Sequence, residues 1–143
     1  MYTLEEDASS PSVSTEALLL TTSIDVVVKR FVSTCDITGA FLKADMDEFV
    51  LLALYNQEIN ALIQANKKYE KIVHKLRNGK KVLYLELMKA MYDCLKSARL
   101  FWEHLSTYLA KLGFIQNKYD LCVAKKTINN STCSIAWHGM LTI

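Results

Sequence analysis

The segment Cys35-Asp36-Ile37-Thr38-Gly39-Ala40-Phe41-Leu42 decides how the whole chain is interpreted. Phe31 to Ile37 is a short, largely apolar run, which predicts a buried strand with Asp36 near its end. The next three residues predict a turn almost free of side chains, where a ligand could approach backbone N–H groups. A carboxylate in this position can hold a divalent cation and the phosphates that accompany it, or it can simply cap the turn. The residues alone leave both interpretations open.

The composition describes one folded domain or a piece of one. The chain has 143 residues, of which 51% are hydrophobic and 22% charged, with a single proline. A net charge of +2 does not require a nucleic-acid partner, but it allows one. No apolar run approaches the roughly 18 residues of a membrane span, and the acidic start is unlike a signal peptide. We therefore expect an intracellular chain without a membrane partner.

The N-terminal part divides into a lead-in and a helix. Residues 1–12 show no apolar period and are expected to be disordered, whereas residues 13–143 should form the domain. Ser14 or Thr15 can cap a helix over about residues 15–29. A strand is the alternative over Ile24 to Val28, where β-branched residues are dense, but the one-sided apolar stripe favours the helix.

The later part alternates strands and helices. The pattern first predicts a strand over 48–55, a helix over 57–71 and a hairpin that turns at Asn78-Gly79. It then predicts a helix over 98–112, between Ser97 and Gly113. Two strands follow, over 121–126 and 132–138, and they are joined at Asn129-Asn130-Ser131. The helix over 98–112 is expected to bury one stripe, which consists of Leu100 or Phe101, Leu105, Tyr108, Leu109 and Leu112, with Trp102 beside them. Asn-Gly is the strongest short hairpin signal, because both turn positions are expected to take positive φ. Lys67, Lys68 and Lys71 form a basic face that is either solvated or in contact with a nucleic-acid backbone.

Two blocks of the chain resemble one protein family. Asp36 to Leu42 resembles the first catalytic motif, Asp-(Val/Ile)-x-x-Ala-Phe-Leu, of the reverse transcriptases of Ty1/copia-type retrotransposons. Lys89 to Tyr92, then Phe101-Trp102, then Leu112-Gly113-Phe114 resemble a second block of the same polymerases. The chain departs from the family at Asp93, where the polymerases carry glycine, and at Lys96-Ser97-Ala98, where many of them carry Gln-Ser-Pro.

The resemblance implies a fold, an activity and a site. The fold would be α+β, with an antiparallel palm-type sheet backed by helices, built from the strand ending at Asp36 and the hairpin over 121–138, and with the Asn78-Gly79 hairpin on the fingers side. The parent enzyme would be an RNA-directed DNA polymerase within a Gag-Pol-type polyprotein, acting on an RNA or DNA primer–template and a dNTP. Asp36 would be catalytic and would bind Mg²⁺. The nucleotide would contact Ile37, the backbone of Gly39 and Ala40, and Phe41, which would stack under the sugar unless it is simply a core residue.

The family's second catalytic element is missing from the sequence. Two-metal nucleotidyl transfer needs several carboxylates from different elements, and the Asp-Asp turn of the family is Gly139-Met140 here. Asp120 is the first candidate for another carboxylate. We therefore expect an incomplete polymerase domain with weak Mg²⁺ affinity and no activity. The alternatives are a non-enzymatic α+β module that binds nucleic acid or protein, and a non-functional transposon remnant.

Overall fold

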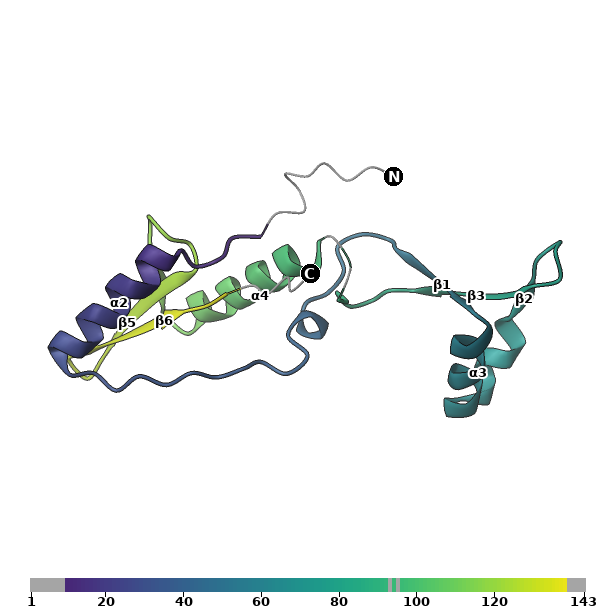
Figure 1. Cartoon of the computed structure of the whole chain (residues 1–143), viewed down its shortest axis with the longest axis horizontal. Coiled ribbons are helices and arrows are strands. Elements are labelled where there is room, and N and C mark those ends of the chain that lie inside the picture. Colours follow the sequence, from purple (N-terminus) through teal and green to yellow (C-terminus); the bar gives the residue numbers. More distant parts are fainter. Residues whose placement is uncertain (1–9, 93, 95, 139–143) are drawn as a thin grey trace. The chain divides into compact units, whose positions relative to one another are not determined.

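The computed structural model describes residues 10–92, 94 and 96–138 and divides the chain into two compact units (Figure 1). One unit contains residues up to Asp45 and from Lys89 onward, and the other is Met46–Met88. Each has a three-stranded antiparallel sheet with helices, which confirms the α+β class. Most of the expected lead-in, residues 1–9, lies outside the described residues. No helix in the described ranges is long and apolar enough to cross a membrane.

The first unit packs two helices against a narrow sheet. Its elements are α2 (Thr15–Val28), η1 (Phe41–Lys43), α4 (Ser97–Lys111), β4 (Ile115–Gln116), β5 (Val123–Ile128) and β6 (Ser131–Ala136), with strand order β4-β5-β6. Neighbouring residues of a strand point to opposite faces. Lys125 lies on the face beside α2, whereas the Nζ atom of Lys126 donates to the carbonyl of Leu112, just after α4, at 2.6 Å. The sheet therefore lies between the two helices (Figure 1).

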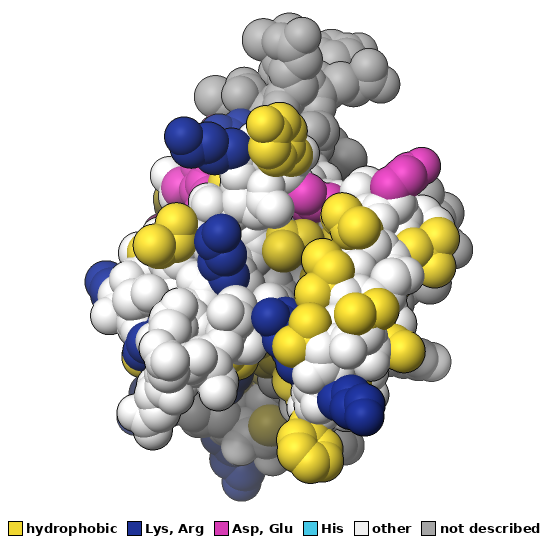
Figure 2. All heavy atoms as spheres, turned by 90° about the vertical axis from the view of Figure 1, so that its left-hand side faces the viewer, with side chains coloured by type: hydrophobic (Ala, Val, Ile, Leu, Met, Phe, Trp, Pro, Cys, Tyr) yellow, Lys and Arg dark blue, Asp and Glu magenta, His cyan; other side chains and the backbone are white. Residues whose placement is uncertain are grey.

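The predicted N-terminal helix is confirmed as α2, and many of its own apolar side chains are exposed. The Ser14 hydroxyl accepts the backbone N–H of Ala17 at 3.1 Å, and Lys29 ends the helix in the left-handed conformation with φ 54°. No residue of α2 is buried. Figure 2 shows apolar side chains gathered on this side of the molecule. In α2, Leu19, Val26 and Val27 are 63%, 72% and 81% exposed.

The strand predicted over Phe31 to Ile37 is wrong. The segment is extended, but it pairs with no strand in the described part of the chain, and Phe31 is fully exposed. The third strand of the sheet is β4 instead. It has only two residues, which pair with Lys125 and Ala124, and so short a strand has no sequence pattern from which to predict it. One edge of β6 is unpaired among the described residues, so a strand-like composition alone does not bring this run into the sheet.

Both hairpins are confirmed, but the turn at Asn78-Gly79 differs from the expected geometry. Asn129 and Asn130 have φ of 46° and 64° between the paired residues Ile128 and Ser131, which is a two-residue type I′ turn. In the Asn78-Gly79 hairpin only Gly79 has positive φ, at 79°. Its N–H donates to the Leu76 carbonyl at 2.9 Å, and the Leu76 N–H donates to the Lys80 carbonyl at 2.8 Å, so glycine forms a bulge after a longer turn.

Helix α4 ends as predicted and buries part of the predicted stripe. Gly113 has φ 85°, and the Phe114 N–H donates to the Leu109 carbonyl at 3.0 Å, which closes the helix. The Ser97 hydroxyl does not cap the helix; it bonds the backbone of Met91. The buried residues of α4 are Ser97, Ala98, Leu100, Phe101 and Leu109. Tyr108 and Leu112, predicted to be core, are 56% and 45% exposed, because three short strands are too narrow to cover the whole helix.

The second unit has its own small core. Its elements are β1 (Leu51–Tyr55), α3 (Asn56–Ala65), η2 (Lys67–Ile72), β2 (His74–Lys75) and β3 (Lys81–Glu86), with strand order β1-β3-β2. Ile59, Val82 and Leu83 are at most 1% exposed and form this core. The single helix predicted over 57–71 is wrong. Asn66, at φ −155° and ψ 110°, interrupts it, and its side chain accepts the Lys68 N–H at 3.0 Å to start η2.

Candidate functional site

The turn after Asp36 has the expected shape. Asp36 and Ile37 are exposed, residues 38–40 turn the chain, and η1 begins at once at Phe41. Gly39 has φ 63°, and a Cβ atom there would meet only the Leu42 Cδ1 atom, at 3.7 Å. The left-handed backbone, rather than lack of space, therefore favours glycine at this position.

Phe41 brings together the two blocks on which the family resemblance rests. Its side chain is 5% exposed. Its ring centroid lies 4.7 Å from that of Tyr92 and 6.0 Å from that of Phe101, the latter in an edge-to-face arrangement. The first motif is thus packed on the start of the second block and on α4. A sugar can reach this ring only if the ring or its neighbours move.

The described residues do not fit a Mg²⁺ site. Within residues 10–92, 94 and 96–138, no three His, Cys, Asp or Glu side chains gather where they could hold a metal ion. Asp45 forms an ion pair with Lys89, whose hydrogen bond and positive charge hold the pKa of Asp45 below its ordinary value of 3.8. Gly139 and Met140 lie outside the described residues, and neither residue type brings a carboxylate. One carboxylate, that of Asp36, is not enough to bind the two Mg²⁺ ions that nucleotidyl transfer requires.

Searches of the chain against protein-family models, curated proteins and solved structures gave no match. The reverse-transcriptase resemblance therefore rests on the residues quoted above.

Asp120 has a structural position that the sequence analysis did not predict. Its Oδ2 atom accepts the Ser14 N–H at 2.8 Å and the Ser14 hydroxyl at 2.9 Å, and its Oδ1 atom accepts the Cys122 N–H at 2.9 Å. Burial raises the pKa of Asp120, but these hydrogen bonds outweigh burial and hold the pKa below 3.8. The carboxylate thus ties the N-terminus of α2 to the start of β5. Part of this role could be predicted from the local sequence, because an Asp that accepts a hydrogen bond from the backbone N–H two residues later commonly forms a turn.

We expect Asp120→Ala to lower the free energy of unfolding of the first unit by about 1–3 kcal/mol, because three hydrogen bonds to a charged acceptor are lost. The pKa of Asp120 is lower in the folded protein than in the unfolded chain. The stabilisation by its charge is therefore complete above about pH 5 and is lost as the pH falls through the folded pKa. Urea denaturation at pH 7 and pH 3 measures both effects. Equal destabilisation by the substitution at the two pH values would contradict the role of the charge. Asp36→Ala, at an exposed carboxylate of the same unit, is the control.

Cys122 is buried beside this carboxylate. Burial first, and then the negative charge of Asp120, raise the pKa of the Cys122 thiol to about 11. The residue is therefore an unreactive thiol at neutral pH, as expected of a structural cysteine. All four cysteines are free, and Cys35 and Cys133 are exposed.

The second unit carries a concentrated positive charge. Residues 67–81, which we call the basic segment, hold seven cationic side chains and one carboxylate, Glu70. The cations are Lys67, Lys68, Lys71, Lys75, Arg77, Lys80 and Lys81, and all of them are exposed. The helical pattern of the sequence indicated only the first three, because the other four lie in the hairpin and share no helical period with them. A solvated cluster of this density is a candidate contact for phosphates.

Proposed function

We propose that residues 13–138 are the fingers and palm part of a copia-type RNA-directed DNA polymerase, and that this chain by itself does not catalyse nucleotidyl transfer. The observation that supports the lineage is the packing of Phe41, from the first motif, against Tyr92 and Phe101, from the second block. In a family polymerase these blocks belong to one palm. A chance match of two short motifs would not require the two blocks to pack together.

The same proposal assigns the remaining elements. The hairpin of β5 and β6 would be the palm hairpin that leads to the catalytic turn, and the basic segment would lie on the fingers side. In the parent enzyme, Asp36 would hold Mg²⁺, and the backbone of Gly39 and Ala40 would face the triphosphate next to Ile37. Here the metal site is incomplete, so no catalytic step is assigned to the chain.

We expect the purified chain to extend no RNA- or DNA-templated primer with Mg²⁺ or Mn²⁺. Loss of metal stabilisation removes several kcal/mol from the transition state, and about 1.4 kcal/mol corresponds to a tenfold change in rate. Asp36→Asn should therefore behave like the unaltered chain in a primer-extension assay. Template-dependent extension that disappears in Asp36→Asn would overturn the proposed inactivity.

The palm assignment itself is tested by restoring the missing carboxylates. If Asp36 and the turn after β6 converge as in a polymerase, the double substitution Gly139→Asp with Met140→Asp should increase Mn²⁺ affinity by at least about tenfold, because hard divalent ions need several carboxylate oxygens. Titration with Mn²⁺, followed by its electron paramagnetic resonance signal, measures this. Adding Asp36→Asn should abolish the gain, whereas the control Asp45→Asn should leave it intact. A gain that does not depend on Asp36 would refute the assignment.

A second candidate function is supported by the basic segment. Seven exposed cations beside one carboxylate are more than a slight excess of positive charge, and they would bind a nucleic-acid backbone without any catalytic residue. This function corresponds to a non-enzymatic binding module. It needs neither Asp36 nor a metal ion, so the two candidates are separable.

A further inference from the structure

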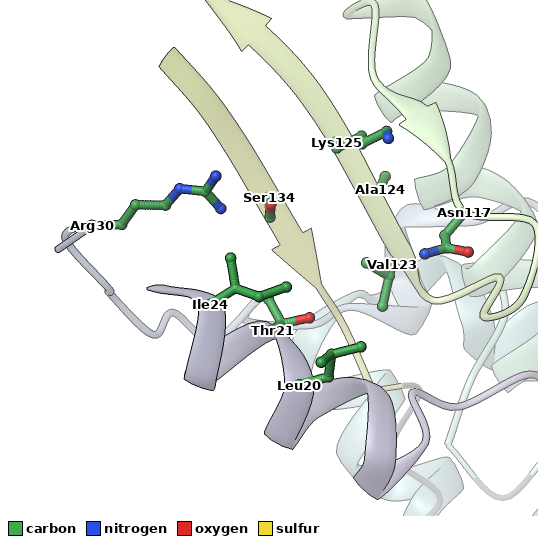
Figure 3. Close-up of a pocket in the computed structure, with 9 residues that line it drawn as sticks. All are labelled: Leu20, Thr21, Ile24, Arg30, Asn117, Val123, Ala124, Lys125 and Ser134. Carbon is green, nitrogen blue, oxygen red and sulfur yellow. The ribbon is translucent and has the colours of Figure 1, made fainter. Parts of the chain in front are cut away.

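A pocket of about 180 Å³ lies in the first unit between α2 and the sheet (Figure 3). Its lining comes from α2, from the residue after its cap, and from all three strands or their ends: Leu20, Thr21, Ile24, Arg30, Asn117, Val123, Ala124, Lys125 and Ser134. None of these residues belongs to the motif at Asp36 or to the basic segment. The pocket is therefore separate from the residues on which the two candidate functions rest.

The charge of the lining is positive. Arg30 and Lys125 contribute two cations. The Arg30 Nη1 atom lies 3.2 Å from the Asp25 Oδ1 atom, which orients the guanidinium and balances one charge. In the part of the chain that the structure describes, no carboxylate lies within ion-pair distance of Lys125. One positive charge is left over, so the pocket favours an anion.

The polar groups of the lining are mainly donors. Asn117 uses its carbonyl oxygen to accept the Tyr119 N–H at 2.8 Å, and its amide nitrogen points toward Val123 in Figure 3. Figure 3 also shows the guanidinium of Arg30 directed toward Ser134, and among the described residues the Ser134 hydroxyl has no hydrogen-bond partner. Thr21 is the exception, because its hydroxyl donates its proton to the Ala17 carbonyl at 2.7 Å and can only accept in the pocket. An acceptor with two or three oxygens, such as a carboxylate or phosphate, matches this set.

The rest of the lining and the volume set the shape of the ligand. Leu20, Ile24, Val123 and Ala124 provide an apolar wall. Pockets for drug-sized molecules usually occupy about 300–1,000 Å³, so this one accepts an anionic head and a few carbon atoms. We propose that the pocket between α2 and β5–β6 binds a small amphiphilic anion, a carboxylate or phosphate monoester with a short alkyl chain. A nucleoside triphosphate is too large for it.

The test uses three probes that share a tail: hexanoate, hexyl phosphate and hexanol. Titrations followed by amide chemical shifts should show binding of one or both anions, with shifts confined to α2, β5 and β6. Hexanol should bind at least about tenfold more weakly, because it offers no charge to Arg30 and Lys125. The ratio of the two anion affinities distinguishes a carboxylate site from a phosphate site. Saturation by hexanol with equal affinity, or shifts elsewhere in the chain, would overturn the proposal.

Adjacent lysines of β5 give a matched pair of variants. Lys125→Met removes the cation of the pocket and should weaken anion binding by about tenfold, since a charge-assisted hydrogen bond is lost. Lys126→Met removes a cation on the opposite face, where Lys126 bonds the Leu112 carbonyl, and should leave affinity unchanged. Arg30→Lys, which keeps the charge, should lose less affinity than Arg30→Gln. Equal effects of the two methionine variants, or no anion binding by the unaltered chain, would refute the site.

Discussion

Phe41→Ala is expected to lower the free energy of unfolding of the first unit by about 3–5 kcal/mol. The ring is 5% exposed and packs against both Tyr92 and Phe101, so its removal loses a large buried surface and leaves a cavity beneath η1. Total stabilities of domains are about 5–15 kcal/mol, so the substitution removes a large share of the stability of the unit. This is the largest stability effect that we expect from a single substitution in the first motif.

The measurement can be restricted to the unit concerned. Both tryptophans of the chain, Trp102 and Trp137, belong to the first unit, so tryptophan fluorescence during urea denaturation reports on that unit. Leu42→Ala is the matched control, because Leu42 is the next residue and is 51% exposed. Its cost should be well below that of Phe41→Ala. Similar costs for the two variants would show that the ring is not part of the core.

The result also bears on the nucleotide-binding role implied for Phe41. A ring that holds η1 against α4 cannot also stack under a sugar without leaving Tyr92 and Phe101. Phe41→Leu separates the two roles, since it keeps most of the buried apolar surface but removes the aromatic face. In a polymerase completed with the missing elements, a change of sugar selectivity in Phe41→Leu with little loss of stability would support the stacking role.

The sequence predicted best those features that depend on a few neighbouring residues. Ser14 caps α2, Gly113 ends α4, and Asn129-Asn130 turns the β5–β6 hairpin, because each depends on the φ or hydrogen bonds of one or two residues. The turn at Asn78-Gly79 was placed correctly, although its geometry was not. Its local sequence fits two turn types, and the register of β2 and β3 selects between them.

Features that depend on distant partners were predicted poorly. The run at Phe31 has the composition of a strand, but pairing depends on whether the folded chain brings it alongside a sheet edge, and that information is not local. Tyr108 has the right helical spacing for a core residue, yet the described residues leave it 56% exposed. For the candidate site, the turn at Gly39 was predicted, whereas the burial of Phe41 was only one of two alternatives. The hydrogen bonds from Ser14 to Asp120 link residues 106 positions apart, and the local sequence does not predict them.

Binding of nucleic acid by the basic segment is the second large effect that we expect. Between four and seven phosphate contacts on a single strand give a slope of log K against log salt of about −3 to −5. The affinity for a fluorescent single-stranded oligonucleotide should therefore fall by about two to three orders of magnitude between 50 and 200 mM salt. Fluorescence anisotropy measures the slope directly. A slope near zero would exclude phosphate contacts as the source of binding.

The triple variant Lys75→Gln, Lys80→Gln, Lys81→Gln identifies the surface responsible. Removing three phosphate contacts should reduce the slope by about 2 and weaken binding by about a hundredfold near 0.1 M salt, because each contact contributes about fivefold there. The control Lys43→Gln, Lys111→Gln, Lys118→Gln changes the net charge equally, at exposed lysines of the first unit. Equal losses in the two variants would mean that net charge, and not the basic segment, drives binding. Asp36→Asn should not alter the affinity, since these contacts require neither a metal ion nor the motif at Asp36.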